Sequence, residues 1–210
     1  MNLSFSVYDL KPRFQQALRP LLASLVRRGV TPNQITVLAM ALSLAYGVVL
    51  ALHPANRWLW GLFPVAMLLR MALNAVDGML ATATGQKTAL GALLNEMGDQ
   101  LSDVALYLPF ALVAQVRAPM LVIVVAAALL AEFAGVLAVL IGADRRFDGP
   151  MGKSDRAVVF GLMGLLVAGG ARADWFDGLL MLTLVLLVWT TVNRLRQALR
   201  AAARGAPRTP

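Results

Sequence analysis

Six stretches of predominantly apolar residues, each close to the length of a membrane span, dominate this sequence. They cover residues 34–52, 58–80, 90–116, 119–142, 157–171 and 175–193. A transmembrane helix needs about 20 mostly apolar residues. The chain is 59% hydrophobic with a mean hydropathy of +0.71, whereas a soluble domain is only about 45–50% apolar. The pattern predicts an all-α integral membrane protein with six transmembrane helices, forming one domain over residues 1–210.

The two ends of the chain are basic and contain no further span. Residues 1–30 mix charges through their length and lack the apolar core of a cleaved signal peptide. One face of this segment is apolar and consists of Phe14, Leu18, Leu21, Leu22 and Leu25. Such a face predicts an amphipathic N-terminal helix lying on the membrane surface. Residues 195–210 form a basic tail that suits a surface of anionic lipid.

The net charge of +8 follows the predicted topology. Fifteen Lys and Arg residues lie on one side of the predicted spans: before the first span and after the second, fourth and sixth. The connections on the other side contain only three, Arg57, Arg117 and Arg172. By the positive-inside rule, both termini and the 81–89 connection face the cytoplasm, as in a multi-pass protein of the inner membrane. Because topology accounts for the basic residues, no nucleic-acid partner is predicted.

Ionisable side chains within the spans mark the candidate site, because such residues are costly in lipid and usually functional. The acids are Asp77, Glu96, Asp99, Asp103 and Glu132. On an ideal helix, Asn95 shares one face with Glu96, Asp99 and Asp103. Asn74 and Asp77 share a face of the preceding span. A short connection makes these helices neighbours, so the two polar faces can meet near the cytoplasmic interface.

Carboxylates that converge in this way repel one another unless a cation lies among them. Mg²⁺, Mn²⁺ and Ca²⁺ prefer carboxylate and amide oxygens, and Asn74 and Asn95 can supply the latter. Zinc is disfavoured because the chain has no cysteine and a single histidine, His53. A divalent cation beside glycines suggests phosphate chemistry, in which two metals could clamp a diphosphate.

The run NAVDGMLATATGQKTALGALLNEMGD resembles the signature of the CDP-alcohol phosphatidyltransferases, D-x-x-D-G-x-x-A-R, eight residues, then G-x-x-x-D-x-x-x-D. The spacing is kept at Asn74, Asp77, Gly78, Ala81, Thr82, Gly91, Asn95 and Asp99. TPNQIT, before the first span, resembles the P-N-x-x-T element that the family places near the nucleotide. The six-span plan with an N-terminal surface helix is also similar to that family.

The resemblance implies transfer of a phosphatidyl group from a CDP-diacylglycerol-type lipid to a small alcohol, with release of CMP. It implies two divalent cations, Mg²⁺ or Mn²⁺, on the diphosphate, with Asp77 and Asp99 as metal ligands and Asp99 also as the general base. It assigns the nucleotide to Asn33, Thr36, Gly78, Ala81, Thr82 and Gly91. A homodimer is expected on the same ground.

Three positions depart from the family pattern. Asn74 and Asn95 stand where the first and third aspartates are expected, and Thr82 stands where the arginine is expected. The motif therefore supplies two carboxylates in place of four. We hypothesise that Glu96 and Asp103 restore the missing charge as further metal ligands. The alternative is a degenerate relative that binds CDP-lipid or metal without transfer.

The connection between the fourth and fifth spans is the candidate acceptor site. Its basic residues are Arg145, Arg146, Lys153 and Arg156. Arginine suits a phosphate group, and the GKSD segment resembles the G-K element of relatives that use phosphorylated acceptors. The same residues could be positive-inside anchors, and a neutral polyol or amino alcohol stays open. We expect Glu132 to pair with Arg70 or another basic residue. A membrane protein that binds or transports cations is the alternative from another class.

Overall fold

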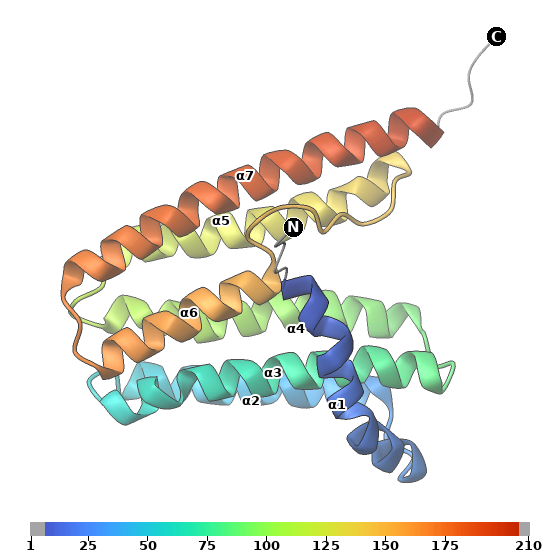
Figure 1. The fold of residues 1–210 in the computed structure, drawn as a ribbon, viewed down its shortest axis with the longest axis horizontal. Helices are drawn as coiled ribbons and strands as arrows, with labels where there is room; N and C mark the ends of the chain where they lie inside the picture. Colours follow the sequence, from blue (N-terminus) through green and yellow to red (C-terminus); the bar gives the residue numbers. More distant parts are fainter. Residues whose placement is uncertain (1–6, 206–210) are drawn as a thin grey trace, which may run out of the picture. The chain divides into compact units, whose positions relative to one another are not determined.

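Seven α-helices and two short 3-10 helices make up the part of the chain that the structure describes. This computed structural model describes the backbone of residues 7–205 and the side chains of residues 14–204. Within those residues there is no strand, which confirms the all-α class. The elements, shown in Figure 1, are α1 (Val7–Arg27), α2 (Pro32–Leu52), α3 (Arg57–Ala83), α4 (Ala89–Tyr107), η1 (Leu108–Leu112), α5 (Ala118–Leu137), η2 (Ala138–Ile141), α6 (Lys153–Ala168) and α7 (Ala173–Gly205).

Four segments of the described chain are long and apolar enough to cross a membrane, judged by length and composition. They are Pro32–Leu52, Arg57–Ala83, Ala118–Ile141 and Ala173–Arg204, which match the first, second, fourth and sixth predicted spans. The other two predicted spans fall on α4 and α6. Helix α4 carries three acids, and α6 has 16 residues, fewer than the roughly 17 that a span needs. The count of six spans stays a prediction.

Two predicted boundaries are wrong, for identifiable reasons. The third apolar segment, predicted as one helix over 90–116, is α-helical only to Tyr107 and continues as η1. Pro109 lies at the start of η1 and interrupts the helix because it lacks a backbone donor and clashes with the preceding turn. Helix α6 begins at Lys153, before the predicted residue 157. The Gly152 N–H donates to Asp155 Oδ2 at 2.9 Å, which stabilises an earlier first turn.

Helix α1 coincides with most of the predicted amphipathic segment, whose first six residues lie outside the described part of the chain. On its apolar face, Leu18, Leu22 and Leu25 pack against a buried cluster of Ile35, Val76 and Leu80 from α2 and α3. Leu21, on the same predicted face, is 46% exposed. Burial of this face therefore accounts for the amphipathic pattern in part, and a position on the membrane surface stays a prediction.

Residue contacts divide the chain into two compact units. Unit 1 comprises Met1–Ala45 and Leu68–Ser102, and unit 2 comprises Tyr46–Met67 and Asp103–Pro210. The whole phosphatidyltransferase-like motif, Asn74 to Asp99, lies in unit 1, together with the TPNQIT segment. The basic connection of residues 144–156 lies in unit 2.

Aromatic side chains form the core of unit 2. Tyr107 and Phe160 stack with ring centroids 3.7 Å apart, and Trp60 lies 4.3 Å from Phe110. A Cβ on Gly164 of α6 would be 2.9 Å from both the Trp60 carbonyl oxygen and Phe63 Cβ. The absence of a side chain at Gly164 therefore allows α6 to lie directly on α3 within this unit.

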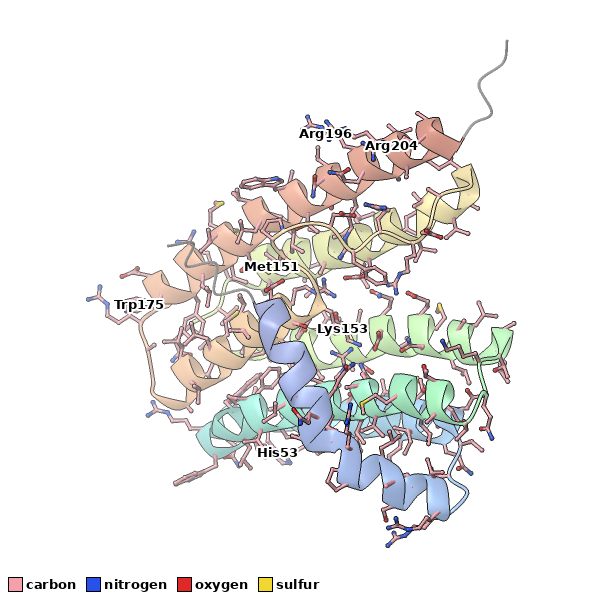
Figure 2. The ribbon with its side chains drawn as sticks, turned by 45° about the vertical axis from the view of Figure 1, so that its right-hand side comes forward. His53, Met151, Lys153, Trp175, Arg196 and Arg204 are labelled. Atoms are coloured by element: carbon pink, nitrogen blue, oxygen red, sulfur yellow. The ribbon has the colours of Figure 1, made fainter. Side chains whose placement is uncertain are left out.

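Helices α5 and α7 lie side by side in unit 2, and the 143–152 connection packs on both (Figure 1). The Arg146 N–H donates to the Gly135 carbonyl of α5 at 3.0 Å. The Met151 N–H donates to Thr190 Oγ1 of α7, also at 3.0 Å. These bonds fix the backbone at Arg146 and at Met151, between the predicted acceptor residues Arg146 and Lys153. On α7, Figure 2 shows Trp175 at one end and Arg196 and Arg204 toward the other.

Candidate functional site

A cavity of about 240 Å³ in unit 1 brings together most of the residues that the motif assigns to the nucleotide. Five of the six predicted nucleotide residues line it, namely Asn33, Thr36, Gly78, Ala81 and Gly91. Asp77, Lys87 and Asn95 line it as well. Thr82 is the exception: it is exposed, and its hydroxyl donates to the Gly78 carbonyl at 3.0 Å.

The start of α2 is built so that Asn33 and Thr36 reach this cavity. The Thr31 N–H donates to Gln34 Oε1 at 2.9 Å, and the Gln34 N–H donates to Thr31 Oγ1 at 3.4 Å. This reciprocal pair is a capping box, and Pro32 occupies the first helical position, where no donor is required. The fixed first turn of α2 also fixes the position of Asn33 against α4. The two are so close that a Cβ on Gly91 would lie 2.8 Å from Asn33 Oδ1.

Asp77 is the buried acid of the cavity. Its side chain is only 6% exposed, and Thr36 Oγ1 donates to its Oδ2 at 2.8 Å. Thr36, which the resemblance places near the nucleotide, therefore also orients the predicted metal ligand. The first turn of α4, with Gly91 and Ala92, lines the same cavity. The N–H groups of these two residues donate to Thr88, and the dipole of the helix N-terminus favours phosphate nearby.

Asp99, the predicted general base, is held by two side chains of α3. Asn74 Nδ2 donates to Asp99 Oδ1 at 2.9 Å. Arg70 Nη2 donates to the Asp99 carbonyl at 2.9 Å and lies 3.6 Å from Asp99 Oδ1. Arg70, Asn74 and Asp77 follow at intervals of four and three, so they share one face of α3. Sequence reasoning missed the pairing of Arg70 with Asp99, although this spacing pointed to it.

The two acids expected to restore the metal charge have different surroundings. Glu96 is half-buried on α4 in unit 1. Asp103 belongs to unit 2, is 3% exposed, and accepts a charged hydrogen bond from Arg156 Nη2 at 2.9 Å. The assignment of Asp103 as a metal ligand stays a prediction, and any cation bound there would compete with a buried guanidinium.

Glu132 is the centre of an ion-pair cluster in unit 2. Arg156 Nη1 lies 2.8 Å from its Oε1, and Arg194 Nη1 and Arg145 Nη2 lie 3.2 and 3.3 Å from its Oε2. The expected pairing of Glu132 with a basic residue is thus observed, but Arg70 is not that residue. Arg194 was missed as a cluster member because it is one of several basic residues that follow the sixth predicted span.

The predicted acceptor residues have intramolecular partners of their own. Arg156 is 1% exposed and bridges Asp103 and Glu132. Arg146 makes two hydrogen bonds to Asp148, at 2.8 and 3.1 Å, and Arg145 lies 4.5 Å from the centre of the Phe147 ring. Lys153 begins α6 and is half-buried beside Met151 (Figure 2).

The residues of the motif do not fit a centre for two divalent cations. Among the residues that the structure describes, no group of three or more His, Cys, Asp or Glu side chains could hold a metal ion. The amides of Asn74 and Asn95 replace two carboxylates, and the Asn74 amide directs an N–H at Asp99. A metal ion at Asp99 Oδ1 would therefore lie next to the Asn74 N–H and the Arg70 guanidinium, neither of which can bind a cation.

Comparison with known proteins identifies the family to which this arrangement belongs. The pattern of conserved residues that defines the CDP-alcohol phosphatidyltransferases matches residues 29–192. The chain belongs to the CDP-alcohol phosphatidyltransferase family. It is 45% identical over 199 residues to the inner membrane protein YnbA of Escherichia coli K12, covering 94% of this chain and 98% of that protein. It is 33% identical over 99 residues to a phosphatidylinositol phosphate synthase of Streptomyces avermitilis, covering 47% and 39% respectively.

Solved structures of one family member share the fold. The phosphatidylinositol phosphate synthase of Mycobacterium tuberculosis with CDP-DAG bound has a TM-score of 0.73 at 18% identity, covering 91% of this chain and 98% of that chain. The same enzyme in complex with manganese and citrate has a TM-score of 0.72 at 19% identity, covering 90% and 92%. At this identity the likeness concerns the fold alone.

Proposed function

We propose that this chain is a CDP-alcohol phosphatidyltransferase of the inner membrane that transfers a phosphatidyl group from CDP-diacylglycerol to a small alcohol. One observation carries the proposal: five residues predicted to bind the nucleotide, from α2, α3 and α4, line one cavity beside Asp77. The family membership and the likeness to an enzyme with CDP-DAG bound support it. Both termini and the cavity are proposed to face the cytoplasm, with the acyl chains in lipid.

The reaction requires one bond to form and one to break at the phosphorus that carries the diacylglycerol. The acceptor oxygen attacks this β-phosphorus, the bond to the bridging oxygen breaks, and CMP leaves with the electron pair. The acceptor proton passes to Asp99, whose carboxylate is oriented by the Asn74 amide, because a positioned carboxylate can accept such a proton. Lys87 and the first turn of α4 line the cavity and would stabilise the negative charge of the diphosphate.

The acceptor is proposed to be a phosphorylated polyol. Three guanidiniums, of Arg145, Arg156 and Arg194, surround Glu132, while Asp103 pairs with one of them. A phosphate on the acceptor would suit this group, because guanidiniums bind phosphate through paired N–H groups. The similarity of this chain to several phosphatidylinositol phosphate synthases supports the same choice.

The experiment that tests transfer measures CMP release from labelled CDP-diacylglycerol by the purified protein in lipid vesicles. Acceptors are offered as matched pairs, glycerol with glycerol 3-phosphate and inositol with inositol phosphate. We expect CMP release with a phosphorylated acceptor and none from the Asp99→Asn variant. The two asparagines of the motif favour a second candidate, a relative that binds CDP-lipid without transfer. It would bind CDP but release no CMP with any acceptor.

A further inference from the structure

The carboxylate of Asp99 already has a positive partner inside unit 1. Arg70 lies 3.6 Å from Asp99 Oδ1, and its side chain is only 3% exposed against 20% for Asp99. A second bond, from Arg70 Nη2 to the Asp99 carbonyl at 2.9 Å, fixes the guanidinium in this place. Arginine stays protonated in proteins. Asp99 is therefore paired with a permanent charge that the protein itself supplies.

The charges of the motif agree with this pairing. A motif with four aspartates balances two divalent cations, whereas this chain keeps only Asp77 and Asp99. Together with Arg70 these two acids carry a net charge of minus one, so two divalent cations bound in the absence of a diphosphate would leave a net charge of plus three. Uncompensated charge is expensive in a poorly hydrated site. The loss of two acids and the presence of a buried arginine on the same face of α3 therefore compensate for each other.

We propose that Arg70 takes the place of one of the two divalent cations expected for this motif, so that the donor site holds at most one such cation. This inference rests on the proposed function in treating the cavity as the nucleotide site. Arg70 is a positioning residue here: it holds Asp99 through charge and through its backbone carbonyl. Asn74 completes the arrangement, because its amide N–H donates to the same oxygen of Asp99. A side chain that bound a metal ion at this position would direct an oxygen lone pair at the ion.

The test counts Mn²⁺ ions bound to the purified full chain, by electron paramagnetic resonance of the free ion, without and with CDP. Native protein is expected to bind no more than one Mn²⁺ per chain in either condition. Two Mn²⁺ per chain would overturn the proposal. This count does not depend on transfer. A chain that releases no CMP but shows the expected count contradicts the proposed function and supports the inference.

Variants test whether Arg70 itself excludes the second ion. Asn74→Asp with Asn95→Asp restores the four acids while Arg70 is kept, and Arg70→Gln is then added. We expect the triple variant to bind a second Mn²⁺ about tenfold more tightly than the double variant, because a unit charge close to the carboxylate is removed. Arg28→Gln, which removes an exposed charge of unit 1, is the matched control. Equal affinity of the triple and double variants would overturn the role of Arg70.

Discussion

Two glycines of the cavity differ in what a side chain would meet there. A Cβ on Gly91 would lie 2.8 Å from Asn33 Oδ1 and 3.1 Å from Thr88 Oγ1, so Gly91 is required for the packing of the protein itself. A Cβ on Gly78 would meet no atom of the described residues within 4 Å outside its own stretch of α3, and Gly78 lines the cavity. The described residues therefore leave room for a side chain at Gly78, and we expect a bound nucleotide to use that space.

Gly78→Ala should therefore separate stability from binding. Alanine replaces glycine inside a helix without a clash, which stabilises the fold by about 0.5–1 kcal/mol. The new methyl group would occupy space proposed for the nucleotide, so we expect CDP affinity to fall. Thermal unfolding and calorimetric titration with CDP measure the two effects. Gly91→Ala should lose both stability and affinity, and native CDP affinity in Gly78→Ala would remove this residue from the site.

The buried arginine of unit 2 makes a second prediction at this scale. Arg156→Gln removes a charged partner from Asp103 and weakens the neutralisation of Glu132. Breaking a buried pair on one side costs about 3–5 kcal/mol. Arg146→Gln, which removes a half-exposed pair with Asp148, is the control, with an expected cost of about 1 kcal/mol or less. Thermal unfolding of both variants measures the difference, and equal losses would contradict the central place given to Arg156.

Helix packing depends on glycines in the same position-specific way. Gly164 of α6 is close to the Trp60 carbonyl and Phe63 Cβ of α3, whereas a Cβ on Gly178 of α7 would meet nothing within 4 Å. We expect Gly164→Ala to destabilise the protein by about 1–3 kcal/mol through overpacking. Gly178→Ala should leave it equal or slightly more stable. Comparison of the two unfolding temperatures tests this, and a loss in Gly178→Ala alone would reverse the assignment.

Prediction from sequence succeeded where local spacing decides the outcome. The motif spacing assigned Gly78 and Gly91 to one site, which one cavity brings together, and apolar runs located the helices. Asn33, which lines the same cavity, was assigned through the family resemblance of the TPNQIT segment. Prediction failed where a contact joins residues far apart in the chain: Arg70 with Asp99, and Arg194 with Glu132. In the sequence, a buried charge is visible only as a charged residue inside an apolar segment. Which residue it pairs with depends on tertiary packing. The break at Pro109 was readable in principle, but the continuous apolar run concealed it.

At the scale of the whole molecule, two topologies place two connections, 113–117 and 143–152, on opposite sides of the membrane. If α4 and α6 both cross the bilayer, the basic 143–152 connection lies in the cytoplasm, as its arginines predict. If only the four longest apolar helices cross, α4 stays on the cytoplasmic side and the same connection lies in the periplasm. Charge distribution favours six spans, whereas the 16 residues of α6, about 24 Å at 1.5 Å per residue, are short for the purpose.

The absence of cysteine from the chain makes this question accessible to labelling. Asp144→Cys, at an exposed position, should react with a membrane-impermeant maleimide only from the cytoplasmic side, in inverted vesicles of the inner membrane. Gln86→Cys is the cytoplasmic control and Asn56→Cys the periplasmic control, because both topologies place these residues alike. Labelling of Asp144→Cys only from the periplasmic side would indicate the topology with four spans. It would also place the predicted acceptor arginines across the membrane from the cytoplasm, so the same result would contradict their proposed role.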